Sequence, residues 1–416
     1  MTSTQKFFRR CCGLDIHKDT VVACVLPPQG GHGKVIRKVY ATFRKDLIRM
    51  RSWLKLLGVT EMAMESTGVY WRPVWNVLEE QGFKLLLVNP AQVKALQGRK
   101  SDRRDAQRIA EFLQDGRLDA SFVPSREIRE LRQMLRHRVS LLEQRNQVHN
   151  QIRDLFETAS IKLSSVASNL LGVTGRGIIE AMIAGQDSPE LLSWKVRGSL
   201  RKKEKQVRES LRGCWGEFHR RMLRAHYQQW QFLSRQIEAF EAEIEGHMRP
   251  YQQQVALLVG IPGVKRIVAW HMIAELGTDM SVFPDAAHCA SWAGMSPGNC
   301  ESAGKKFHSR TKKGNKYLRR TLTQAAWAAI RYKPGYLRAF FYRVKARQGA
   351  GKAIFAVAHK ILVSAYCMLK TKTPYQDLGS NYFDQLHPAR IVRRMVQRLE
   401  RLGLHVTIRP AETPTP

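Results

Sequence analysis

The sequence predicts an α/β domain followed by a largely helical remainder, and three observations support this fold class. Short β-type runs alternate with helical runs up to residue 113. From about residue 125 onward, apolar side chains recur every three or four positions, as on one face of a helix. The chain has 416 residues, enough for about two or three domains with cores of their own. We therefore predict an α/β domain over 1–155, a helical or coiled-coil arm over 156–250 and a mostly helical domain over 251–416.

The elements of the first domain follow one another in a regular order. Apolar residues dominate five short runs, which we interpret as strands: 11–18, 20–27, 34–43, 61–65 and 83–90. Helical spacing marks three further runs: 44–58, 71–82 and 98–113. Strands that alternate with helices in this way indicate a mixed or parallel sheet.

The remainder of the chain has the spacing of long amphipathic helices. Its first apolar positions follow one another at steps of three or four: Ile128, Leu131, Leu135, Val139 and Leu142. A similar pattern returns between about 194 and 248, which favours a helical arm. The Gly-rich run 170–185 follows no predicted strand, so a junction between helices is favoured over a phosphate-binding loop. The last residues, 409–416, are expected to be disordered.

The charge of the chain points to a polyanionic partner. It has 69 Lys and Arg residues against 35 Asp and Glu residues, a formal net charge of +34. Such an excess would repel itself unless a polyanion were the usual partner. Because the basic residues are spread over the whole chain, we expect a long contact surface with nucleic acid, and an anionic membrane surface is the alternative.

Cysteines and apolar runs bear on the compartment of the protein. The seven cysteines form no C-x-x-C pair and no cluster at zinc-finger spacing, so reduced thiols are expected. The N-terminal run meets an Asp too early for a signal peptide. His359 and Lys360 interrupt the apolar run 353–369, which is also short for a bilayer span. We predict a cytoplasmic protein without membrane contact.

Asp102 and Asp105 stand in an otherwise basic helical run. Their spacing of three places both carboxylates on one helix face. The run's basic residues are Arg99, Lys100, Arg103, Arg104 and Arg108. Taken alone, these two acids could have a purely structural role. Ser101 could cap the helix, Asp102 could interact with the positive end of the helix dipole, and Asp105 could pair with a neighbouring Arg.

Two further acids lie in apolar strands of the same domain. Alternation places Asp15 opposite the apolar face of its strand, beside Gly13, and separates Glu65 from Met62 and Met64. An acid in such a strand is costly unless it is paired or binds a cation. Together the four acids could hold Mg²⁺, which prefers carboxylate oxygens. The neighbouring Arg and Lys side chains would bind the phosphate backbone that the metal activates: Arg99, Lys100, Arg103 and Arg104.

Two segments of the last domain are candidates for phosphate contact. The run I-P-G-V at 261–264 joins two helical runs and precedes Lys265 and Arg266, so it fits a helix-hairpin-helix or an ordinary turn equally well. Further along, Ser302 lies in a Gly-rich loop. That loop carries five basic residues: Lys305, Lys306, Arg310, Lys312 and Lys313. A hydroxyl on such a loop is more commonly a phosphate contact than a nucleophile.

Four motifs give the chain a specific resemblance. The runs "GLDIHKD", "MESTGVYW", "NPAQVKALQGRKSDRRDA" and "SAGKKFHSRTKKGNKYLRR" occur in this order. They resemble the successive motifs of the DEDD transposases of bacterial insertion sequences, the one-hundred-and-ten family, which includes the Piv-like DNA invertases. The resemblance implies an RNase H-like (RuvC-like) fold for residues 1–155. It implies an acidic tetrad at Asp15, Glu65, Asp102 and Asp105.

The same resemblance implies a mechanism and partners. Ser302, rather than Ser296 or Ser309, would be the nucleophile that forms a phosphoserine link to DNA while the tetrad holds Mg²⁺. Donor and target DNA would be chosen by a non-coding bridge RNA, and the protein would be a homo-oligomer, a dimer or tetramer. Two rivals remain open: a metal-dependent nuclease or Holliday-junction resolvase that uses water as nucleophile, and a non-catalytic architectural DNA binder.

Overall fold

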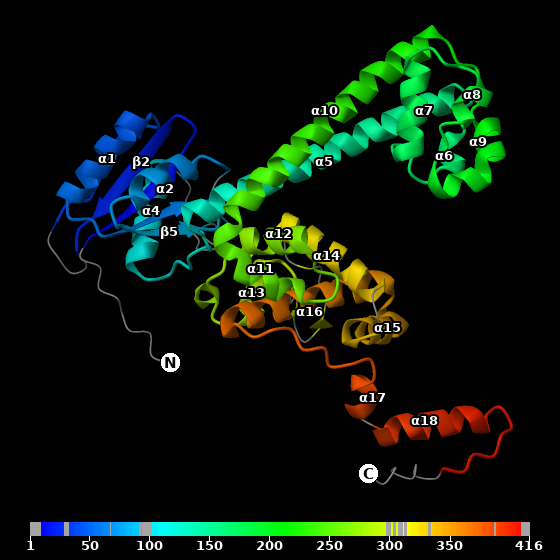
Figure 1. Ribbon diagram of the computed structural model, residues 1–416. Helices are drawn as coiled ribbons and strands as arrows, with labels where there is room; N and C mark the ends of the chain where they lie inside the picture. Colours follow the sequence, from blue (N-terminus) through cyan, green and yellow to red (C-terminus); the bar gives the residue numbers. More distant parts are fainter. Residues whose placement is uncertain are drawn as a thin grey trace. The chain divides into compact units, whose positions relative to one another are not determined.

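The computed structural model describes most of the chain. The described residues are 10–28, 33–66, 68–90, 93, 102–296, 301–302, 305–306, 311, 314–331, 334–386 and 388–408. For residues 102–104, 301–302 and 305–306 only the backbone is described. The chain divides into two compact units, Met1–Arg126 and Glu127–Pro416, which are considered separately below (Figure 1).

The first unit contains a mixed five-stranded sheet in the order β3-β2-β1-β4-β5. Its strands are β1 (Cys11–Ile16), β2 (Thr20–Leu26), β3 (Ile36–Ala41), β4 (Glu61–Glu65) and β5 (Lys84–Val88). β1, β2 and β3 pair antiparallel, whereas β4 runs parallel to both β1 and β5. The helices in the described part of this unit are α1 (Arg44–Leu56), α2 (Trp71–Glu79) and α4 (Asp102–Gln114). Each of these described strands and helices matches a run predicted from the sequence.

Alternation along the strands assigns each face of the sheet to different helices. On one face, buried side chains of β1 and β4 pack with buried residues of α1 and α2: Cys12, Leu14, Met62, Met64, Leu47, Met50, Val74 and Leu78. On the other face, the intervening residues pack with α4: Cys11, Ala63, Val88, Ile109, Ala110 and Leu113. The two-residue period of the strands therefore separates two hydrophobic layers.

Gly13 allows α4 to pack directly on β1. A Cβ atom at Gly13 would lie 2.1 Å from the carbonyl oxygen of Ala106 and 2.5 Å from the amide nitrogen of Ala110. One turn further along α4, the carbonyl oxygen of Ala110 accepts a 3.6 Å hydrogen bond from the Cys11 thiol. β1 and α4 therefore run in opposite directions, because the contacts on α4 shift from Ala110 toward Ala106 between Cys11 and Gly13 of β1. The N-terminus of α4 consequently lies toward the C-terminal end of β1.

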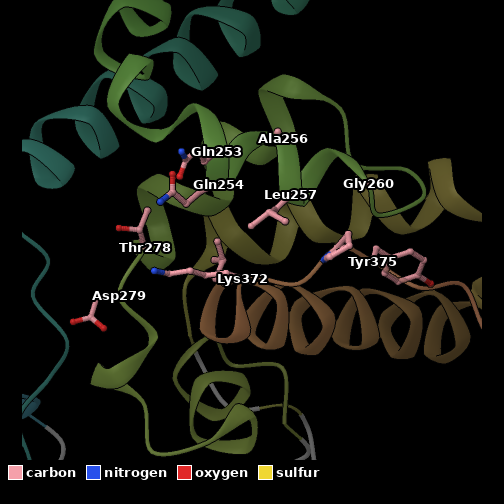
Figure 2. Close-up of a pocket in the computed structure, with 11 residues that line it drawn as sticks. Gln253, Gln254, Ala256, Leu257, Gly260, Thr278, Asp279, Lys372 and Tyr375 are labelled. Carbon is pink, nitrogen blue, oxygen red and sulfur yellow. The ribbon is translucent and has the colours of Figure 1, made fainter.

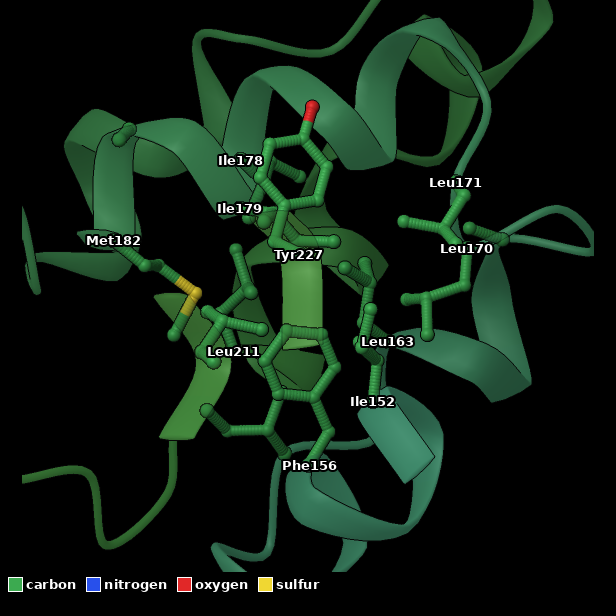
Figure 3. Close-up of a cluster of buried hydrophobic side chains, with 14 of the residues drawn as sticks. Ile152, Phe156, Leu163, Leu170, Leu171, Ile178, Ile179, Met182, Leu211 and Tyr227 are labelled. Atoms are coloured by element: carbon green, nitrogen blue, oxygen red, sulfur yellow. The ribbon is translucent and has the colours of Figure 1, made fainter. Parts of the chain in front are cut away.

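The second unit begins with a helical arm. Its two long helices, α5 (Arg126–Thr158) and α10 (Glu217–His247), run side by side in Figure 1. Between them the chain forms α6 (Leu163–Val166), α7 (Val173–Ile183), α8 (Pro189–Ser193), the 3-10 helix η1 (Gly198–Lys203) and α9 (Glu204–Ser210). One hydrophobic cluster joins these elements, including Ile152, Phe156, Leu163, Ile178 and Tyr227 (Figure 3). Most of the Gly-rich run 170–185 forms α7 itself, and only residues 170–172 belong to the connection from α6, so the predicted helix junction accounts for the start of the run alone.

Of the helical stretch expected between about 194 and 248, the long helix α10 begins at Glu217. Residues 194–216 instead form short pieces, because three glycines interrupt them. Gly198 has φ +60° at the start of η1, and a Cβ at Gly213 would lie 2.2 Å from the carbonyl oxygen of Ala159. Gly216 is the extended N-cap residue of α10. The expected helical character is confirmed for residues 198–210, which form η1 and α9, but these helices are short.

The rest of the second unit is helical. It contains the 3-10 helix η2 (Arg249–Tyr251), α11 (Gln252–Val259), α12 (Arg266–Leu276), the 3-10 helix η3 (Met280–Val282), α13 (Ala286–Trp292), α14 (Lys316–Arg331), α15 (Tyr336–Gln348), α16 (Ala350–Thr371), α17 (Tyr382–Leu386) and α18 (Pro388–Glu400). A two-stranded ribbon, β6 (Glu301–Ser302) and β7 (Lys305–Lys306), precedes α14. Among the described helices, α16 has the length and apolar composition of a membrane span, but 56% of that stretch is buried inside the fold.

Candidate functional site

Two of the predicted acids lie at the C-terminal ends of neighbouring parallel strands. β1 and β4 pair in a register that matches Gly13 with Ala63 and Leu14 with Met64. Asp15 and Glu65 each follow this last matched pair by one residue along their strands. Asp15 and Glu65 lie on the face of the sheet that α4 covers. Each follows by two residues a position on that face: Gly13, which contacts α4, and Ala63, which belongs to the cluster with α4. The sheet therefore places both acids at one end of one face.

The first turn of α4 is directed toward the same end of the sheet. Asp102 begins this helix and Asp105 follows one turn later. Since α4 runs backward along β1 from Ala110 to Ala106, its next turn toward the N-terminus contains these two acids. We call the place where β1 and β4 end and α4 begins the carboxylate edge. Sequence alternation indicated the faces of Asp15 and Glu65, and the Gly13 contact brings the backbone of the first turn of α4 to the same end of the sheet.

The described side chains at the carboxylate edge make local pairs. Oδ2 of Asp15 lies 3.1 Å from Nε2 of His17, and the Asp15 side chain is 15% exposed. Oδ1 of Asp105 lies 3.4 Å from a guanidinium nitrogen of Arg108, as the structural explanation of this acid predicted. Glu65 is half-buried, and the side chain of Asp102 is outside the described part. Within the described residues, no group of three or more His, Cys, Asp or Glu side chains is close enough to hold a metal ion.

The predicted basic contacts have different surroundings. Lys265 is exposed at the start of α12. Arg266 is partly engaged, since its Nη1 lies 2.6 Å from Oε1 of Glu245 and its guanidinium lies 5.0 Å from the Trp270 ring centre. For the other predicted basic contacts, the structure describes only the backbone or does not describe the residue. Arg103 and Arg104 are in the first turn of α4 and Lys305 and Lys306 in β7, whereas Arg99, Lys100, Arg310, Lys312 and Lys313 lie outside the described residues.

Ser302 is part of a short β-ribbon. In the antiparallel register of this ribbon, Ser302 pairs with Lys305 and Glu301 pairs with Lys306. The sequence predicted a loop here, and the ribbon was missed because each strand has only two residues. The pairing holds the backbone of Ser302 beside that of a lysine.

The I-P-G-V turn between α11 and α12 packs against α14. Gly263 has φ +84°, and a Cβ there would lie 2.2 Å from the carbonyl oxygen of Ala325 and 2.6 Å from the amide nitrogen of Ala329. The predicted connection between two helices is confirmed. Its glycine serves close packing within the fold, whereas Lys265 and Arg266 are the exposed basic residues that follow the turn.

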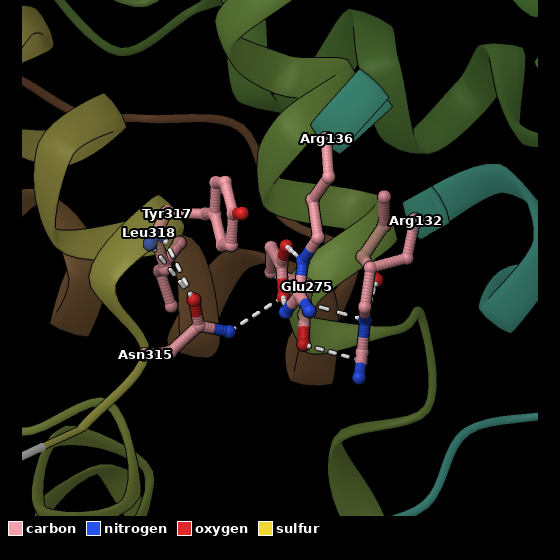
Figure 4. A network of polar contacts seen from close by, with 7 residues as sticks. Arg132, Arg136, Glu275, Asn315, Tyr317 and Leu318 are labelled. Atoms are coloured by element: carbon pink, nitrogen blue, oxygen red, sulfur yellow. Dashed lines mark hydrogen bonds and ion pairs between the residues drawn. The ribbon is translucent and has the colours of Figure 1, made fainter. Parts of the chain in front are cut away.

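A buried carboxylate that sequence reasoning missed organises the base of the arm. Glu275, on α12, is 1% exposed. Arg136 of α5 donates two 2.8 Å hydrogen bonds to its two carboxylate oxygens. Arg132 donates to the backbone carbonyls of Ala274 and Glu275 at 2.8 and 2.9 Å (Figure 4). An acid inside the apolar run of α12 was the available signal, because it carries the same burial cost as an acid in a strand.

The same carboxylate fixes the start of α14. Nδ2 of Asn315 donates a 2.5 Å hydrogen bond to Oε2 of Glu275, and Oδ1 of Asn315 accepts from the backbone amides of Tyr317 and Leu318 (Figure 4). Asn315 therefore caps α14 while it is held by Glu275. We call these contacts of Glu275, Arg132, Arg136 and Asn315 the Glu275 network. It anchors the C-terminal end of the segment that contains Ser302.

A second buried charge pair joins the two arm helices near this network. Nε of Arg138 on α5 donates a 2.7 Å hydrogen bond to Oε1 of Glu241 on α10. His271 of α12 is buried, and burial together with the positive charge of Arg138 lowers its pKa to about 4. This histidine is therefore neutral at pH 7.

Comparison with protein families identifies the chain. A DEDD-type transposase model matches residues 12–161, and the model of the transposase IS116/IS110/IS902 family matches residues 255–342. The chain belongs to this transposase family. The first match includes all four acids of the carboxylate edge, and the second includes Ser302 and Glu275.

Individual relatives agree with this assignment. The chain is 25% identical to a probable family 20 transposase of Pseudomonas aeruginosa, over 83% of this chain and 94% of the relative. It is 23% identical to the transposase for insertion sequence element IS1111A of Coxiella burnetii, over 88% of this chain and 90% of the relative. A pilin gene-inverting protein of Moraxella bovis is 30% identical over 29% of this chain and 38% of its own length.

This transposase is therefore an enzyme that cuts and rejoins DNA strands. Transposases of the DEDD type depend on divalent metal ions. Carboxylate oxygens, the donors that Asp15, Glu65, Asp102 and Asp105 would supply, are the ligands that hard divalent cations prefer.

Proposed function

We propose that this transposase moves an insertion sequence by cutting DNA through a phosphoserine intermediate at Ser302, with Mg²⁺ held by Asp15, Glu65, Asp102 and Asp105. The observation that supports it best is the carboxylate edge. It is supported by the register of β1 and β4 and by the Gly13 contact of α4, which bring the C-terminal ends of the two strands and the first turn of α4 to one end of the sheet. In this proposal residues 1–155 form an RNase H-like (RuvC-like) domain.

The chemistry proceeds by exchange of one phosphodiester for another. The Ser302 oxygen attacks phosphorus, the DNA phosphorus–oxygen bond breaks, and the serine proton ends on the released DNA hydroxyl. The bound metal would offset charge on the phosphate oxygens. Lysines and arginines of the same segment would stabilise the charged transition state. Because the phosphoserine keeps the energy of the broken bond, a DNA hydroxyl can displace Ser302 and reseal a strand without ATP.

Partners and organisation complete the proposal. The high positive charge supports binding of donor and target DNA together with a bridge RNA, in which base pairing selects the sequence and the protein reads backbone and shape. We further propose a cytoplasmic homo-oligomer with an arm over 156–250 and a serine-bearing domain over 251–416.

A covalent-adduct assay tests the nucleophile. Wild type and the Ser302→Ala, Ser296→Ala and Ser309→Ala variants would be incubated with radiolabelled element-end DNA, co-purified RNA and Mg²⁺, then separated on a denaturing gel. Only Ser302→Ala should lose the protein-bound label while retaining DNA binding. An adduct that survives Ser302→Ala, or cleavage with no adduct in the wild type, would favour the nuclease that uses water.

A second assay tests the metal. Asp102→Asn and Asp105→Asn should each abolish Mg²⁺-dependent cleavage with DNA affinity almost unchanged, since a lost carboxylate loosens the metal but leaves the phosphate contacts. The proposed tetrad fails if both variants cleave like the wild type.

A further inference from the structure

A basic cavity lies beside both ends of the segment that contains Ser302. Its volume is about 660 Å³, within the range of about 300–1,000 Å³ typical of small-molecule pockets. Met295, which directly precedes this segment, lines the cavity, and so does Thr311 near the other end. Nη2 of Arg319 in α14 donates a 3.1 Å hydrogen bond to Oγ1 of Thr311. This hydrogen bond therefore connects a residue of the cavity wall to the segment that carries the proposed nucleophile.

The lining of this cavity is cationic. Arg319, Lys352 and Lys360 contribute positive charge, and the described lining contains no Asp or Glu. The contrast is a second cavity of about 720 Å³ between α11 and the end of α16 (Figure 2). There Lys372 is accompanied by Asp279, so that lining carries no such excess of positive charge. Of these two cavities, the first has the electrostatics of an anion site.

The start of α16 adds to the attraction for an anion. Gly349, its N-cap residue, has φ +83° and contributes no side-chain hydrogen bond to the first turn. Gly351 and Lys352 in that turn line the cavity, and a Cβ at Gly351 would have no atom within 4 Å. The backbone amides of a 22-residue helix thus begin at an open, cationic pocket. Such amides and the helix dipole favour phosphate groups.

Aromatic rings give the cavity a second kind of surface. Phe340 and Phe355 line it and are half-buried. The guanidinium of Arg319 lies 5.3 Å from the Phe355 ring centre, and Nζ of Lys360 lies 5.9 Å from that of Phe340. Rings interleaved with cations are the surface on which proteins stack bases of single strands. A simple phosphate would need the cations but not the rings.

We propose that this cavity holds one unpaired nucleotide of the DNA strand that Ser302 cuts. Its phosphate binds Arg319, Lys352 and the first amides of α16, and its base packs against Phe355. Capture of a neighbouring nucleotide would hold the scissile phosphate beside Ser302. This last step rests on the proposed nucleophile, whereas binding of the nucleotide does not.

Binding is tested without cleavage. In a Ser302→Ala background and without metal, fluorescence anisotropy would measure the affinity for fluorescein-labelled hexathymidylate and for a duplex. Lys352→Gln and Arg319→Gln should each weaken binding of the single strand about tenfold, as expected for a lost hydrogen bond to a charged group. Duplex affinity should change less than twofold. Lys372→Gln, at the other cavity, is the matched control and should bind both like the parent.

Equal losses for single strand and duplex, or single-strand binding that matches the parent in both cavity variants, would overturn the proposal. Its position is tested by crosslinking of 5-iodouracil in the cleaved strand. A label next to the scissile phosphate should attach to a peptide containing Phe355, and a label ten nucleotides away should not. Attachment elsewhere from both positions would place the nucleotide outside this cavity. Since none of these measurements needs an adduct, failure of the phosphoserine proposal would appear separately.

Discussion

Replacing Glu275 with alanine should strongly destabilise the second unit. The change removes an almost fully buried carboxylate, which leaves Arg136 without its acceptor and Arg132 without its ion-pair partner, although Arg132 keeps its two backbone acceptors. Removing one partner of a buried ion pair costs about 3–5 kcal/mol. The side chains of Arg132 and Arg136 remain 15% and 29% exposed, so water partly compensates them. We therefore expect the lower end of that range, about 3 kcal/mol.

Thermal unfolding followed by far-UV circular dichroism measures this loss, because most helices belong to the second unit. At about 2 °C per kcal/mol for a large domain, the midpoint should fall by about 6 °C. Glu275→Gln should fall less, since its amide oxygen still accepts a hydrogen bond.

The control is Glu245→Ala, which removes the exposed ion pair with Arg266. Both side chains of that pair are more than half exposed, so its loss should cost under about 1 kcal/mol. If Glu275→Ala unfolds at the same temperature as this control, the Glu275 network does not stabilise the base of the arm as reasoned here.

Three further changes test other features. Gly13→Ala should displace α4, because its Cβ would lie 2.1 Å from the Ala106 oxygen; we expect a loss of about 1–3 kcal/mol and of metal-dependent cleavage, measured by thermal unfolding and a nicking assay. Gly263→Ala should destabilise more than Gly349→Ala in the same unfolding measurement, since both have φ near +83° but only Gly263 also meets α14. Finally, His271 binds a proton below about pH 6.5 when unfolded but only below about pH 4 when folded, so acid favours unfolding through that window by up to about 3 kcal/mol. Urea titrations at pH 7 and pH 4.5 should show this loss for the wild type, and a smaller one for His271→Gln.

The local order of the first unit could be predicted because each element carries its own pattern. Two-residue alternation in β1 and β4 placed Asp15 and Glu65 opposite their apolar neighbours, and the same alternation separates the two layers of the observed core. Gly13 was recognised as a place of close approach. The identity of its neighbour, Ala106, was not predictable, because nothing in either segment specifies a contact across more than 90 residues.

The second unit was harder to predict for the same reason. Arg136 and Glu275 are 139 residues apart, and only the packing of α5 on α12 brings them together. The ribbon at Ser302 has two residues in each strand, too few for alternation to be visible. In the stretch 194–216, helical spacing correctly indicated the helices over 198–210, but it did not show that they would be short or that Gly198, with φ +60°, would start the first of them.

The arm contains one helix that belongs to two cores. α5 has 33 residues, so it rises about 50 Å at 1.5 Å per residue. Its first turns hold the Glu275 network, whereas from Leu141 onward its buried residues belong to the cluster with α6–α10. These two sets of contacts share no side chain, so the far end has the means to open as a cooperative unit while the base stays closed. Amide hydrogens would then exchange with solvent faster beyond Leu141 than near Arg136, and the boundary between fast and slow exchange would fall within a single unbroken helix.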